Sequence, residues 1–174
     1  MGDIVPMKHI KIRQATVEDA GTIACIHIDS WRANYRGLVP DDYLDGLDYG
    51  KRELALRDWL RRIVPDHIVV EVNGIVRGFC DFGVCRDTDM PDAGEVWGIY
   101  IAPDFMGQGL GRMLMEYAEK RLFSKWNTVA LWVVVGKDSS IGFYEHLGYR
   151  ADGKRAPLHV GGEKMRMVKI RLNN

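Results

Sequence analysis

The sequence lacks a long apolar run and an excess of charge of either sign. No stretch of its 174 residues is long and apolar enough to span a bilayer, and the opening MGDIVPMKHI lacks the apolar centre of a signal peptide. Lys+Arg and Asp+Glu are equal at 24 each, so the charge balance points neither to nucleic acid nor to a membrane surface. We therefore expect a cytoplasmic protein that binds neither.

Cysteine is scarce, and histidine is scattered. Cys25, Cys80 and Cys85 form no C-x-x-C pair and each lies in an apolar run, which predicts buried, reduced thiols of the kind found in the cytosol. No two histidines have the spacing of metal ligands, so we expect no bound metal. The length, without repeats, linkers or low-complexity segments, predicts one domain over residues 1–174.

Alternating and helical periodicities follow one another along the chain and predict an α/β fold with a mixed sheet. Strands are expected at residues 10–13, 67–72, 75–82, 95–101, 128–135, near 149 and at 164–171. Helices are expected from 16 to about 35, at 51–63, from about 109 to 125, and from 139 or 140 to 147. A short turn is expected at Pro40, and a polar loop over 86–94.

Local signals predict how some of these elements begin and end. Thr16 and Asp19 have the spacing of a capping box. The Asn73-Gly74 pair favours a tight hairpin turn, because both residues tolerate positive φ. Gly148 fits the position just after a helix. In the helix over 51–63, five side chains are expected to point inward: Leu54, Leu56, Trp59, Leu60 and Ile63.

Three glycines alternate at 107, 109 and 111, between a predicted strand and a predicted helix. Glycine allows close approach of the backbone to a ligand, and the start of a helix offers unpaired N–H groups to an anion. The segment predicts a phosphate or pyrophosphate site with Arg112 at its rim, although a tight turn alone would also use glycine. A Rossmann loop would need glycine at 112, and a P-loop would need Gly-Lys-Ser/Thr.

The segment Met106–Gly111 resembles motif A of the GNAT acetyltransferases, Arg/Gln-x-x-Gly-x-Gly/Ala, with Met106 at its first position. Phe143–Tyr149 is similar to the family's Phe-Tyr-Glu-x-x-Gly-Phe/Tyr segment, and Lys137 stands where many members carry an Asn. The opening 12–20 also resembles the usual start of the family. The resemblance covers nearly the whole chain and implies a single-domain fold in which helices flank a mixed, mostly antiparallel central sheet.

The resemblance implies acetyl-CoA as cosubstrate. In the family, the loop amides hold the pyrophosphate and the preceding strand holds the pantetheine arm through its backbone. Carried onto this sequence, the cofactor-binding residues are Ile99, Tyr100, Ile101, Gly107, Gln108, Gly109, Leu110, Gly111, Arg112 and Lys137.

Transfer of an acetyl group to an amine also needs proton transfers. A lysine-like amine has a pKa of about 10.4, so a base or water must remove its proton. By resemblance, Glu95 is the expected base and Tyr144 the acid that protonates the leaving thiolate. A solvated carboxylate at a strand end and a half-buried aromatic side chain are the structural interpretations of the same two residues.

The acceptor is a small-molecule or protein amine that the sequence does not identify. Trp31 and Tyr35 lie four residues apart on one helix face, so they either line the acceptor pocket, beside Arg32 and Arg36, or simply pack. The aspartates at 41, 42, 45 and 48 would suit a cationic acceptor. An acyl-CoA sensor without turnover and another acyl group both stay open. So does a homodimer, because many members of the family dimerise.

Overall fold

The computed structural model describes residues 9–171, and residues 1–8, on which the expected absence of a signal peptide depends, lie outside this range. Within it the elements follow one another in this order: β1 Ile10–Gln14, η1 Val17–Asp19, α1 Ala20–Asn34, α2 Asp41–Asp45, α3 Tyr49–Trp59, β2 Asp66–Val72, β3 Ile75–Val84, β4 Gly94–Ile101, η2 Pro103–Phe105, α4 Leu110–Leu122, β5 Thr128–Val134, α5 Asp138–His146, β6 Arg150–Pro157 and β7 Glu163–Ile170.

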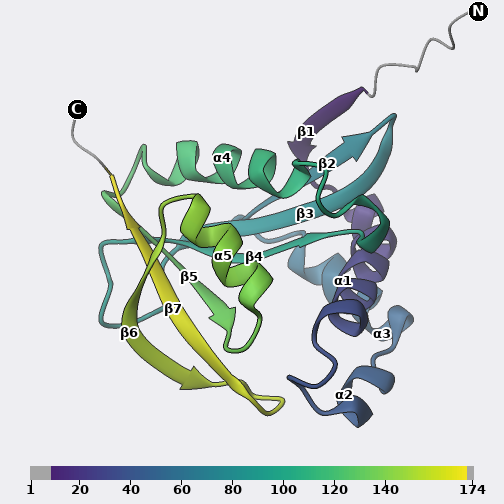
Figure 1. Ribbon diagram of the computed structural model, residues 1–174. Helices are drawn as coiled ribbons and strands as arrows, with labels where there is room; N and C mark the ends of the chain where they lie inside the picture. Colours follow the sequence, from purple (N-terminus) through teal and green to yellow (C-terminus); the bar gives the residue numbers. More distant parts are fainter. Residues whose placement is uncertain (1–8, 172–174) are drawn as a thin grey trace, which may run out of the picture.

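The strands form one sheet in the order β1-β2-β3-β4-β5-β7-β6. Every neighbouring pair is antiparallel except β4 and β5, which run parallel, so the predicted mixed, mostly antiparallel sheet is confirmed. Figure 1 shows α1, α2 and α3 grouped together, apart from α4 and α5. Within residues 9–171, no helix is long and apolar enough to cross a membrane.

Helices cover both faces of the sheet, and β2 shows why. Successive side chains of a strand point to opposite faces. Ile68 and Val70 pack in a cluster that contains the apolar stripe of α4, whereas Val69, between them, packs in a cluster with α1 and Leu56 of α3. The strand is therefore apolar at consecutive positions because both of its faces are buried.

The parallel pair β4–β5 is short, and this shapes the site. Its ladder joins Gly94, Glu95 and Val96 to residues 129–131, and the described residues form no further pair between the two strands. The rest of β4 continues only along β3. The two strands thus separate toward their C-terminal ends, where α4 and α5 begin.

The predicted local signals hold at the ends of the elements. The Asp19 carboxylate accepts a hydrogen bond from the Thr16 backbone N–H at 2.8 Å, as a capping box requires. Asn73 and Gly74 have φ of 53° and 79°, the left-handed pair of a tight hairpin. Gly148 has φ of 92° just after α5.

The prediction for the second long helix was wrong in its end and for two of its five inward side chains, whereas Leu56, Trp59 and Leu60 do pack in the cluster with α1. The helix α3 ends at Trp59, short of Pro65, which disfavours helix in the residue before it. Leu56 is buried, but Leu54 is 67% exposed, because residues two apart on a helix do not share a face. Ile63, beyond the helix, is 93% exposed.

Three smaller expectations also need correction. The turn at Pro40 continues into the short helix α2. Lys137, rather than a serine, occupies the N-cap of α5. All three cysteines are free, but only Cys80 and Cys85 are buried; Cys25 is exposed, because its position on α1 faces away from the sheet that buries Ala24 and Ile26.

Candidate active site

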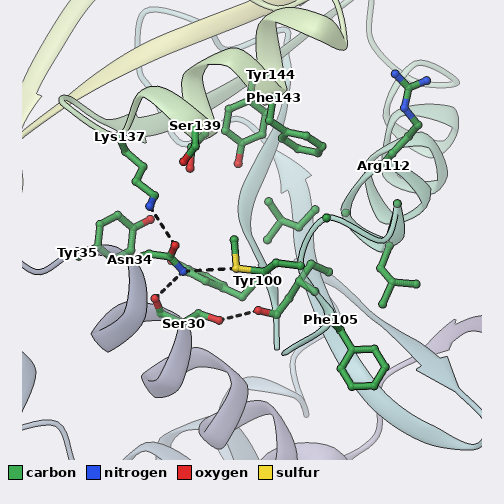
Figure 2. Close-up of a pocket in the computed structure, with 18 residues that line it drawn as sticks. Ser30, Asn34, Tyr35, Tyr100, Phe105, Arg112, Lys137, Ser139, Phe143 and Tyr144 are labelled. Carbon is green, nitrogen blue, oxygen red and sulfur yellow. Dashed lines mark hydrogen bonds between the residues drawn. The ribbon is translucent and has the colours of Figure 1, made fainter. Parts of the chain in front are cut away.

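A cavity of about 520 Å³ lies where β4 and β5 separate. Figure 2 shows its walls: α1 with Ser30, Asn34 and Tyr35 on one side, α5 with Ser139, Phe143 and Tyr144 on another, and α4 with Arg112 on a third. The lining residues are Ser30, Asn34, Tyr35, Ile99, Tyr100, Ile101, Phe105, Met106, Gly107, Gly109, Leu110, Gly111, Arg112, Lys137, Ser139, Ser140, Phe143 and Tyr144.

The glycine loop forms one end of this cavity with backbone atoms. Gly107 and Gly109 have φ of 73° and 84°, a conformation that L side chains rarely adopt. Gly109 is the N-cap of α4, and a Cβ atom built on it would meet no atom within 4 Å. At Gly111, by contrast, a Cβ would lie 3.4 Å from the Phe143 ring, so this glycine lets α4 and α5 approach. The loop therefore presents the free N–H groups of a helix start to open space.

Tyr144 brings a hydroxyl group to the cavity from α5, and in Figure 2 this hydroxyl points inward. Its ring packs 5.2 Å from that of Phe143 and 6.1 Å from that of Tyr149. Burial raises the pKa of the Tyr144 hydroxyl well above its ordinary value of 10.0, with smaller contributions from Tyr35 and Tyr100. The hydroxyl therefore carries its proton throughout the neutral range.

The wall formed by α1 is polar and is tied to the other elements by hydrogen bonds. The Ser30 hydroxyl donates to the backbone oxygen of Ile101 at 2.8 Å. The Asn34 amide nitrogen donates to the Ser30 backbone oxygen at 2.9 Å, and its oxygen accepts from Lys137 Nζ at 3.0 Å. These contacts, drawn as dashed lines in Figure 2, connect α1 to β4 and to the start of α5.

Most of the residues selected from the sequence meet at this cavity. Eleven of the fourteen line it: Tyr35, Ile99, Tyr100, Ile101, Gly107, Gly109, Leu110, Gly111, Arg112, Lys137 and Tyr144. Glu95, Gln108 and Trp31 do not. Gln108 turns back to donate to the Asp104 backbone oxygen at 3.1 Å.

Glu95 is buried at the other end of β4, with 1% of its surface exposed. At the usual strand rise it lies about 13 Å along the strand from Ile99. Its carboxylate accepts hydrogen bonds from the Arg86 backbone N–H at 2.8 Å and from the Arg86 guanidinium, which stacks 4.4 Å from the Trp97 ring. The structural interpretation of Glu95 as a solvated carboxylate is therefore wrong, because the carboxylate is buried and ion-paired.

Trp31 stands behind the cavity wall rather than in it. Its Nε1 donates to the Tyr100 hydroxyl at 3.1 Å, and its ring lies 5.0 Å from that of Tyr35. The two arginines beside it are engaged elsewhere: Arg32 with the backbone oxygen of Leu47, and Arg36 with the carboxylates of Asp41 and Asp45. The acidic turn is thus partly neutralised by its own chain.

Seven lining residues were missed as site residues: Ser30, Asn34, Phe105, Met106, Ser139, Ser140 and Phe143. Ser30 and Asn34 do carry a signal, because they are polar, lie four apart on a mainly apolar helix and flank Trp31. Within residues 9–171, no three His, Cys, Asp or Glu side chains are grouped so as to hold a metal ion.

Comparisons with known proteins identify the class to which this fold and cavity belong. The model of the acetyltransferase (GNAT) family matches residues 29–149, which is more than half of the chain. The chain therefore belongs to the GNAT acetyltransferase family.

The chain is 34% identical over 138 residues to the uncharacterized N-acetyltransferase YuaI of Bacillus subtilis, covering 78% of each protein. Its fold is similar to the PaiA N-acetyltransferase of Thermoplasma acidophilum in complex with coenzyme A, with a TM-score of 0.76, 19% identity, and 93% and 99% of the two chains covered. It is also similar to yncA, a putative acetyltransferase of Salmonella typhimurium with acetyl-CoA, with a TM-score of 0.70, 20% identity, and 95% and 96% covered.

Proposed function

We propose that the protein is a single-domain N-acetyltransferase that moves an acetyl group from acetyl-CoA directly to a primary amine of a small molecule or a protein. One observation carries the proposal. The glycine loop and the Tyr144 hydroxyl open into the same cavity, so an anion site and a proton donor face one ligand space. Membership of the GNAT family and the coenzyme A or acetyl-CoA of the two structural neighbours support it.

The residues present fit coenzyme A. The backbone N–H groups at the start of α4 would hold the pyrophosphate, and the open space at Gly109 gives the phosphates room. The backbone of Ile99 and Ile101, along the part of β4 that has left β5, would hold the pantetheine arm as a strand holds a peptide. Bound there, acetyl-CoA supplies the thioester that the amine attacks.

Tyr144 then serves as the general acid. Its hydroxyl stays protonated because burial raises its pKa, and it faces the cavity where the thiolate would leave. A positioned acid contributes typically 10²–10⁴-fold. We expect Tyr144→Phe, which removes only the oxygen, to lower kcat by about that range while calorimetry shows unchanged affinity for acetyl-CoA. A full rate in Tyr144→Phe would mean that the thiolate leaves without this acid.

The route of the amine proton has two candidates, water and Glu95, and the role of Glu95 stays a prediction. Its ion pair with Arg86 and its distance from the cavity favour water as the direct acceptor. The pH–rate profile of Glu95→Gln separates the two. A lost or shifted acidic limb would support Glu95, whereas an unchanged profile would leave water as the base.

The experiment that tests the activity is release of free coenzyme A thiol by the purified protein with a panel of amines: polyamines, aminoglycosides, amino acids and peptides with free N-termini. Thiol release above the no-amine rate with any class supports transfer, because the reaction without amine measures hydrolysis alone. Tight binding of acetyl-CoA without release for any amine would favour the sensor interpretation instead. Propionyl-CoA and succinyl-CoA in the same assay define the acyl preference.

A further inference from the structure

A second hollow, of about 720 Å³, lies at the far end of α4 from the candidate active site. Side chains from residues 63–66, 82–84 and 117–126 form it, and we call it the distal groove. Leu110, at the start of α4, lines the active-site cavity, whereas Leu122, at its end, lines the distal groove. The two residues are about 18 Å apart along the helix. The groove is therefore a separate place on the molecule.

Large apolar side chains gather in the distal groove although they are exposed. Among residues 9–171, nine large hydrophobic side chains are exposed, and four of these line the groove: Ile63, Val64, Val84 and Tyr117. Ile63 is 93% exposed and Val64 54%. Single apolar side chains on a surface are ordinary, but a group of them at one hollow is typical of an interaction site.

The charged side chains of the groove are mainly cations. Lys120, Arg121 and Lys125 line it, against the single carboxylate of Asp66, which lies 3.6 Å from Arg121. Among residues 9–171, neither Lys120 nor Lys125 forms an ion pair, and the Lys125 ammonium lies 5.8 Å from the centre of the Trp126 ring. Cations stabilise the C-terminal end of a helix, but that role does not require exposed apolar neighbours. Together, the two kinds of side chain favour a partner that is both apolar and acidic.

The surroundings of the groove favour a helix as its occupant. Phe82 pairs with β2 on one side and with β4 on the other, so the sheet has no free edge here to which a strand could add. Tyr117, Lys120 and Arg121 lie three and four positions apart and share one face of α4. A second helix can pack along this face with its apolar side chains in the hollow.

Two other occupants fit the groove less well. A second copy of this chain, related by a twofold axis, would bring the same patch against itself and place Lys120 and Lys125 near their own counterparts. A lipid bilayer would suit the cations, but its flat surface does not fill a hollow of this volume.

We propose that the distal groove docks an acidic amphipathic helix of another protein. The apolar side chains of that helix lie in the hollow, and its carboxylates lie beside Lys120 and Lys125. Docking at this end of α4 leaves the active-site cavity open, and the inference does not depend on acetyl transfer.

The test measures the binding of three labelled peptides to the full-length protein by fluorescence anisotropy. Each peptide has about 20 residues, which is long enough to hold a helix. The first carries leucines on one face and glutamates on the other, the second has lysines in place of the glutamates, and the third has glutamines in place of the leucines. The first should bind at least about tenfold more tightly than the others, because it alone complements both features of the groove. Added salt should weaken its binding.

Two pairs of variants locate the bound peptide. Ile63→Ser removes an apolar side chain from the groove, and Lys125→Glu reverses a charge there. Each should weaken binding of the first peptide about fivefold or more. Leu54→Ser and Lys51→Glu make the same changes at exposed positions of α3, outside the groove, and should change the affinity less than about twofold. Circular dichroism should show that all four variants are folded.

Three results would overturn the inference: no binding of the first peptide, equal binding of all three, or binding that Ile63→Ser and Lys125→Glu leave unchanged. Two further measurements detect the other occupants. If the first peptide does not bind but vesicles of phosphatidylserine and phosphatidylcholine do, and Ile63→Ser abolishes this, the groove is a membrane contact. If instead sedimentation shows a dimer that Ile63→Ser dissociates, the groove is an interface between two copies of the chain.

Discussion

Mild acid is expected to destabilise the protein through His27, on the α1 side of the cavity. The imidazole packs among aromatic rings, 4.8 Å from Tyr100 and 5.5 Å from Trp31. Its Nδ1 is buried without a hydrogen-bond partner among residues 9–171. Burial, with a smaller effect from the charge of Arg52, lowers the pKa of His27 from 6.5 to about 3. The folded protein therefore holds this ring neutral.

The direction and size follow from linkage between folding and protonation. Because the pKa is lower in the folded state, the unfolded chain takes up the proton first, and stability is lost as the pH falls below about 6.5 toward 3. At pH 5.0 the unfolded histidine is mostly protonated and the folded one is not. The ordinary pKa of 6.5 lies about 1.5 units above pH 5.0. Each unit corresponds to about 1.4 kcal/mol, so the free energy of unfolding should fall by about 2 kcal/mol.

Urea unfolding at pH 7.5 and pH 5.0 measures this loss. His27→Phe keeps an aromatic ring but cannot take up the proton. Its loss of unfolding free energy between pH 7.5 and pH 5.0 should therefore be smaller than that of the wild type by about 2 kcal/mol. Groups that titrate in both proteins cancel, as does any constant effect of the substitution. His159→Phe, at an exposed position, should behave like the wild type. Equal pH dependence in wild type and His27→Phe would refute the argument.

Three further predictions concern the glycine loop, Trp31 and the ion pairs of Arg166. Gly109→Asp should abolish acetyl-CoA binding in calorimetry while circular dichroism shows the fold intact; Gly109→Asn, similar in shape but uncharged, should retain part of the affinity. Trp31→Ala, which removes the ring packed behind Tyr35 and Tyr100, should raise the acceptor KM more than the acetyl-CoA KM, and equal effects would assign Trp31 to packing. Arg166→Met should cost about 3–5 kcal/mol in urea unfolding, since it leaves Asp87 and Asp152 without their buried partner; a loss under 1 kcal/mol would contradict this.

The parts of the site that the sequence predicts are those formed by neighbouring residues. The glycine loop is one example: strand, loop and helix follow one another directly between residues 94 and 122, and the positive φ of Gly107 and Gly109 is a local requirement. The hairpin at Asn73-Gly74 is another. In both cases the backbone conformation limits which residue types fit, so the residue types indicate the conformation.

The parts that the sequence does not predict depend on contacts between distant segments. Ser30 reaches the backbone of Ile101, 71 positions away, and Lys137 reaches Asn34, 103 positions away. Hydrophobic periodicity predicts which face of α1 is buried, but it does not predict which strand this face packs against. Glu95 shows the same limit: its place on β4 is evident from the sequence, but its burial against Arg86 depends on how the loop after β3 folds back.

The position of the cavity depends on a β-bulge in β4, which no sequence motif predicts. Along β3 and β4, Asp81 faces Gly98 and Phe82 faces Val96, so Trp97 is an extra residue in β4. Such a bulge bends a strand and increases its twist. The parallel ladder with β5 ends at Val96, the residue just before the bulge. We infer that the bulge turns β4 away from β5, which frees the backbone of Ile99 and Ile101 on that side and opens the space between α4 and α5. The glycine loop and Tyr144 of α5 line the same cavity, and in the proposed function they serve one ligand because β4 bends at Trp97.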